Sequence, residues 1–142
     1  MHIIDSHFHY WPLSVWTELT KRREAPRARL SETRKGGYDY FSSSGRQEKF
    51  MGGSPEWFHL DEQLAHMDGL GHQVDVVCSI GPFSVVFSDM EKNAGKALAT
   101  LWNEEMAAAQ RLYPGRVWAS AAVPLQDTKD AIDVVDHAIN KL

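Results

Sequence analysis

Two histidines near the start of the chain, His7 and His9, have the spacing of a metal-binding pair. They close a short apolar stretch, residues 2–8, that is predicted to form a buried strand. Side chains two residues apart on a strand point to the same face, roughly 7 Å apart at the backbone, so both imidazoles can reach one ion. Zinc, or a similar ion such as manganese, binds imidazole nitrogen at about 2.0–2.1 Å. We therefore predict that His7 and His9 are metal ligands.

An isolated His-x-His pair also occurs by chance, so its setting decides between the two interpretations. Here it follows Ile-Ile-Asp on the first predicted strand of an alternating pattern, which is the setting that such a metal site requires. A relay through Asp5, Ser6 and His7 is excluded, because neighbouring residues on a strand face opposite ways. The metal interpretation is therefore favoured.

Predicted helices and strands alternate along the rest of the chain. They are a helix over 60–70, a strand over 74–80, a helix over 91–113, a strand over 117–123, and a last helix that begins at Asp127 or Thr128. Strands separated by helices of this length pair in parallel through crossover connections. The predicted fold class is therefore α/β.

Two α/β architectures compete for this pattern. A doubly wound sheet could be completed in 142 residues, whereas a closed (β/α)8 TIM barrel typically needs about 250 residues. However, no Gly-rich turn follows the first strand, and the last helix reaches Leu142 without a Gly or Asn to end it. We therefore expect residues 1–142 to be a partial domain, the N-terminal part of a barrel that is truncated after its third helix.

Residues 10–58 show no lasting helical or strand period and contain several Gly-rich turns, which predicts a long loop or small subdomain that serves as a lid. Seven of the fifteen lysines and arginines fall between Lys21 and Lys35. They form a solvated face, or one of the arginines binds a substrate carboxylate through two hydrogen bonds. Its many aromatic side chains could anchor the segment or line a pocket for a planar substrate. Trp11 is the best pocket candidate, because it follows the histidines directly.

In (β/α) barrels the site lies at the carboxyl ends of the strands. Ser79 and Phe83, after the second strand, are therefore predicted to line the substrate pocket together with Trp11. Gln126 and Asp127, after the third strand, would face the same mouth, although a helix cap is the favoured role of Asp127.

Composition excludes several other functions. The formal net charge of −4 argues against a nucleic-acid binder. No apolar run approaches the ~20 residues that cross a bilayer, and a signal peptide is lacking, so we expect a cytoplasmic protein without a membrane partner. The single cysteine, Cys78, lies in an apolar run and is predicted to be a buried thiol.

Four segments together resemble the amidohydrolase-related family that includes aminocarboxymuconate-semialdehyde decarboxylase. They are Ile-Ile-Asp-Ser-His-Phe-His at 3–9, Leu-Ala-His-Met-Asp-Gly-Leu-Gly at 64–71, Tyr-Pro-Gly-Arg-Val at 113–117 and Ala-Ala-Val-Pro-Leu-Gln-Asp at 121–127. The Pro-Gly-Arg and Pro-Leu-Gln-Asp stretches point to the decarboxylase-like branch. The resemblance implies a (β/α)8 barrel with a divalent metal, which decarboxylates or hydrolyses aromatic or ring-cleavage carboxylic acids.

Members of this family take further site residues from later strands, so the catalytic acid and base are expected beyond Leu142. The other histidines predicted on helices or turns, His59, His66, His72 and His137, do not replace them. A second hypothesis is therefore a noncatalytic fragment or subunit that needs a complementary chain or a homo-oligomer, because three strands leave open edges and uncovered apolar faces. A third is a small doubly wound binding protein.

Overall fold

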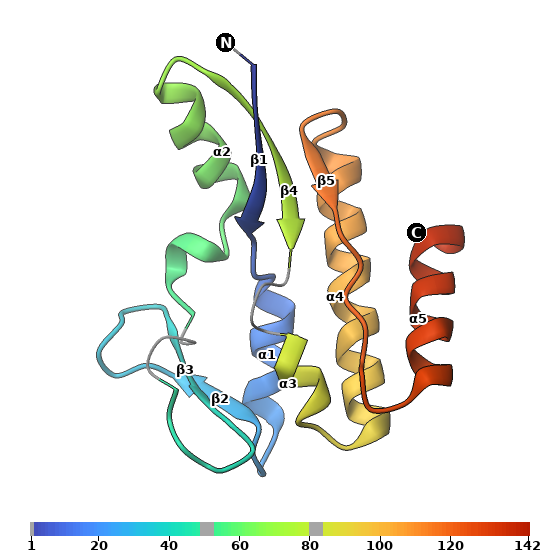
Figure 1. Cartoon of the computed structure of the whole chain (residues 1–142). Helices are drawn as coiled ribbons and strands as arrows, with labels where there is room; N and C mark the ends of the chain where they lie inside the picture. The colour runs from blue at the N-terminus through green and yellow to red at the C-terminus, as the bar shows by residue number, and fades with distance from the viewer. Residues whose placement is uncertain (1, 49–52, 80–83) are drawn as a thin grey trace.

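The computed structural model describes residues 2–48, 53–79 and 84–142 of the chain. Its centre is a parallel sheet of three strands, β1 (His2–His9), β4 (Gln73–Ser79) and β5 (Val117–Ala119), in the order β1-β4-β5 (Figure 1). Helices connect these strands in the crossover pattern that parallel pairing requires. The predicted α/β class with a parallel sheet is confirmed.

Helices cover one face of this sheet. Helices α2 (Leu60–Gly69) and α4 (Lys92–Leu112) contact its strands, and the short α3 (Ser84–Ser88) and α5 (Thr128–Lys141) pack against α4. On the covered face Val76 and Cys78 are fully buried, whereas Ile4 and Trp118 on the other face are 64% and 51% exposed. Parallel sheets are normally covered on both faces, so the second face is open in a way that is unusual for this class.

The predicted helices lie where the sequence places them, within one or two residues at their ends. The side chain of Asp127 caps α5 by accepting a hydrogen bond from the amide of Asp130 at 3.0 Å, which confirms its predicted role. The third strand, however, is shorter than predicted and ends at Ala119. The side chain of Asn103 in α4 accepts a hydrogen bond from the N–H of Ala122 at 2.8 Å and donates one to its carbonyl at 2.9 Å. The backbone groups of Ala122 are therefore hydrogen-bonded without a partner strand.

Residues 10–58, for which the sequence predicts a long loop or a small subdomain, contain regular elements. The segment contains α1 (Leu13–Lys21), an antiparallel hairpin of β2 (Arg27–Leu30) and β3 (Tyr38–Phe41), and the 3-10 helix η2 (Pro55–Trp57). Figure 1 shows these elements below the arrowheads of β1 and β4, at the carboxyl ends of the strands. Each of these elements is too short to give the sequence a recognisable hydrophobic period. In α1, for example, only Val15, Trp16 and Leu19 form the buried face.

Aromatic contacts hold this segment together. Trp16 is fully buried and stacks on Tyr38 with ring centroids 5.3 Å apart, and the ring of Phe58 lies 6.0 Å from it. Among the described residues, every helix is too short or too polar to pass through a bilayer. That the segment acts as a lid stays a prediction.

Candidate functional site

His7 and His9 lie together at the carboxyl end of β1. Their ring centroids are 4.8 Å apart, and the rings meet edge to face at 76°. His7 is exposed and His9 is half-buried, with Nδ1 of His9 3.4 Å from the backbone carbonyl oxygen of Ser79. The two imidazoles are thus close enough for one ion to contact both.

A bulge in β1 determines which face these histidines share. Asp5 pairs with Val76 and Phe8 pairs with Cys78, so three steps along β1 correspond to two along β4. One extra residue reverses the alternation of side chains, because their period on a strand is two. Phe8 is therefore buried on the covered face, while His7 and His9 point to the open face. The bulge was not predicted from the sequence, where its one possible sign is the polar segment Asp-Ser-His at 5–7 within an apolar strand.

The other predicted pocket residues have different surroundings. Ser79 is the register partner of His9 and lies at the same mouth. Trp11 is 2% exposed and packs edge to face against Trp57, with centroids 4.3 Å apart. This packing is that of an anchor, so a role of Trp11 in the substrate pocket stays a prediction. Phe83 lies outside the described residues.

The described part of the chain holds no group of three or more His, Cys, Asp or Glu side chains arranged to bind a metal. The other four histidines lie on, beside or between helices and strands rather than at the carboxyl ends of the strands: His59 directly precedes α2, His66 is in α2, His72 is in the bend before β4, and His137 is in α5. The site therefore supplies two imidazoles, which is part of a ligand set.

Four basic residues of the segment 10–58 pair with carboxylates of the chain: Lys21, Arg22, Arg29 and Arg34. Arg34 donates to Asp39 at 3.0 Å, and Arg29 lies 3.6 Å from the same carboxylate. Burial alone would raise the pKa of Asp39, but hydrogen bonds from Ser31 and Arg34 and the charges of both arginines outweigh it and lower this pKa. These arginines thus stabilise the hairpin, and an arginine that clamps a substrate stays a prediction.

Cys78 is the buried thiol that the sequence predicts. Burial, with a smaller effect of the Asp5 charge, raises the pKa of Cys78 to about 12. A thiol with such a pKa is protonated at neutral pH and is a poor nucleophile.

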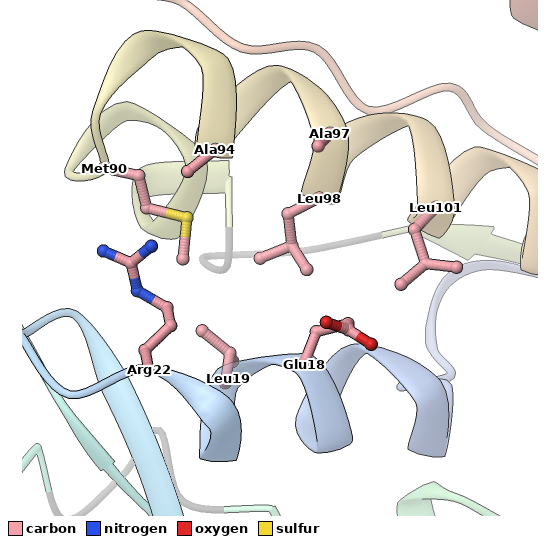
Figure 2. A pocket seen from close by; sticks show the side chains of 8 residues that line it. All are labelled: Glu18, Leu19, Arg22, Met90, Ala94, Ala97, Leu98 and Leu101. Atoms are coloured by element: carbon pink, nitrogen blue, oxygen red, sulfur yellow. The ribbon is translucent and has the colours of Figure 1, made fainter.

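A separate cavity of about 290 Å³ lies between α1 and α4, as Figure 2 shows. Its floor is apolar, with Leu19 and Leu98 facing each other, and Glu18 and Arg22 stand at its rim. Arg22 is already bound to the carbonyl of Pro26 at 2.6 Å and to Glu91 at 3.1 Å. Neither His7 nor His9 lines this cavity, so it is distinct from the histidine pair.

No model of a known protein family matches this chain, and no curated protein matches it either. Among solved structures, it is similar to a protein from Staphylococcus aureus that has been assigned as an amidohydrolase. The two share 18% sequence identity and a TM-score of 0.62, over 99% of this chain and 34% of that one. This chain therefore has the fold of one part of that protein and spans about a third of its length.

Proposed function

We propose that this chain is the N-terminal part of an amidohydrolase-related (β/α)8 enzyme and that His7 and His9 are two of its metal ligands. The observation that carries the proposal is the 4.8 Å separation of the two rings at the carboxyl end of β1. Barrel enzymes place their sites at this end of the strands. The likeness in fold to the Staphylococcus aureus protein supports the same class of enzyme.

Zinc is the ion that best suits two imidazoles, with manganese as the alternative. A hydrogen bond from Nδ1 of His9 to the Ser79 carbonyl would leave Nε2 free for the metal. When bound, the ion supplies Lewis-acid chemistry to a substrate oxygen or to water. The expected reaction is hydrolysis or nonoxidative decarboxylation of a small carboxylic acid, in a pocket to which Trp11, Ser79 and Phe83 contribute.

Titration of the metal-free chain with zinc, followed by calorimetry, tests this proposal. We expect one zinc per chain, bound weakly because two ligands are fewer than the three or four of a complete site. His7→Ala and His9→Ala should each abolish binding, whereas His66→Ala, which removes an exposed imidazole from α2, should leave it intact. Binding that survives both substitutions, or no binding by the wild type, would contradict the proposal.

The second candidate function is a noncatalytic subunit that a complementary chain completes. The exposed Ile4 and Trp118 on the uncovered sheet face favour it, because apolar patches of this kind mark interaction surfaces. Light scattering on the isolated chain distinguishes the two candidates. A chain that associates without zinc, and stops doing so in Trp118→Lys, supports the subunit. A zinc-binding monomer supports the enzyme site.

A further inference from the structure

Asp5 is a carboxylate on the apolar, helix-covered side of the sheet. Its register partner on β4 is Val76, and the next β4 residue on this face is Cys78, both fully buried. The charge of Asp5 contributes to the raised pKa of Cys78, so the carboxylate lies near that thiol. A half-buried carboxylate in such surroundings costs free energy unless hydrogen bonds compensate for the lost water.

Its hydrogen-bond partner is the backbone of the bulge. The amide of His7 donates to Oδ1 of Asp5 at 3.0 Å. A bulge takes the backbone groups of its extra residue out of the ladder between the two strands. Asp5 therefore satisfies an amide that the change in register between β1 and β4 would otherwise leave without a partner from β4.

We propose that Asp5 is a positioning residue for the metal-binding pair: by accepting the His7 amide, it stabilises the bulge that turns His7 and His9 to the open face. Without this acceptor, regular pairing of β1 with β4 is favoured. A shift of one residue reverses the face to which each later side chain points. The inference rests on the proposed function, since the pair needs positioning only if it binds a metal.

The first measurement is made on the full chain without metal. Nuclear magnetic resonance follows the exchange rate of the His7 amide and the mutual ring-current shifts of His7 and His9. Asp5→Val, which suits the apolar face but cannot accept, should speed amide exchange roughly tenfold or more and remove the ring contact. Asp5→Asn, whose amide oxygen can still accept, should retain both. Asp5→Glu keeps the charge but moves the acceptor, so it should behave like Asp5→Val. If Asp5→Val does not fold, Asp5→Glu takes its place in the test.

The second measurement is zinc affinity. Asp5→Val should weaken binding by roughly 10- to 100-fold, as loss of a residue that supports a ligand does, and Asp5→Asn should keep it. Two controls on β1 separate positioning from stability. Ile3→Ala removes packing against the core and should lower stability without changing affinity. Ser6→Ala, which alters an exposed side chain within the bulge, should change neither.

The two measurements can fail separately. If Asp5→Val and Asp5→Glu keep the His7 amide protected and the rings in contact, or if Asp5→Asn loses both, Asp5 does not hold the bulge and the inference is overturned. If the wild type binds no zinc, the proposed function fails, and with it the metal-positioning role. The metal-free measurement still decides whether Asp5 fixes the direction of the two histidines.

Discussion

The parallel sheet and the segment 10–58 are held by different kinds of contact. In the sheet, β-branched and small side chains such as Val76 and Cys78 are buried under long helices, and the backbone ladder sets the arrangement. In the segment, short elements surround a cluster of aromatic rings centred on Trp16, and a buried carboxylate, Asp39, binds two arginines. The two histidines lie at the end of β1, directly before the segment 10–58 begins.

The largest loss of stability is expected when the indole of Trp16, at the centre of the aromatic cluster, is removed. Trp16→Ala deletes a fully buried indole and should lower the free energy of unfolding by about 3–5 kcal/mol, as measured by urea denaturation. Hydrogen exchange should show that α1 and the hairpin open before β4. Trp118→Ala is the matched control, because it removes an indole that is half exposed, and it should cost less than about 1 kcal/mol. Equal losses in the two variants would show that the aromatic cluster does not hold the segment.

A smaller effect is expected where the helices meet. A Cβ added at Gly95 of α4 would lie 2.4 Å from the carbonyl oxygen of Phe87, so Gly95→Ala must separate α3 from α4 and should cost about 1–3 kcal/mol. Gly69→Ala is the control of opposite sign. A Cβ there meets nothing within 4 Å, and alanine is favoured over glycine in a helix, so this variant should gain about 0.5–1 kcal/mol. A neutral Gly95→Ala would show that the contact between α3 and α4 is loose.

The smallest expected effect is the loss of the stability contributed by Asp39 at acidic pH. Because the folded state lowers the pKa of Asp39, its contribution to stability is present above the unfolded pKa, about 3.9, and is lost as the pH falls through the folded value. Asp39→Asn should therefore be less stable than the wild type at pH 7, and the difference should shrink toward pH 3. Thermal unfolding across this range measures it. A difference that is independent of pH would show that the arginine pairs contribute little.

The helices and strands around the parallel sheet could be predicted from the sequence, but the hairpin and the bulge in β1 could not. Long apolar periods predicted helices over 60–70 and 91–113, which the structure places at 60–69 and 92–112. The β-branched run predicted β4, because packing against a sheet requires these patterns. The hairpin was not predicted, because three consecutive residues of β3, Tyr38, Asp39 and Tyr40, are all buried. A strand with one buried face would instead alternate polar and apolar residues. The spacing of His7 and His9 predicted that they point together. The face to which they point depends on a bulge, which is a property of the register between two strands.

Nuclear magnetic resonance of the histidine rings during zinc addition shows whether His7 and His9 bind one ion together. If one ion binds both imidazoles at the end of β1, the ring signals of His7 and His9 should shift together and saturate at the same ratio of zinc to chain. The signals of His66 and His137, which lie on helices, and of His59, which directly precedes α2, should not move with them. Independent shifts of His7 and His9, or a first response at any other histidine, would contradict the account.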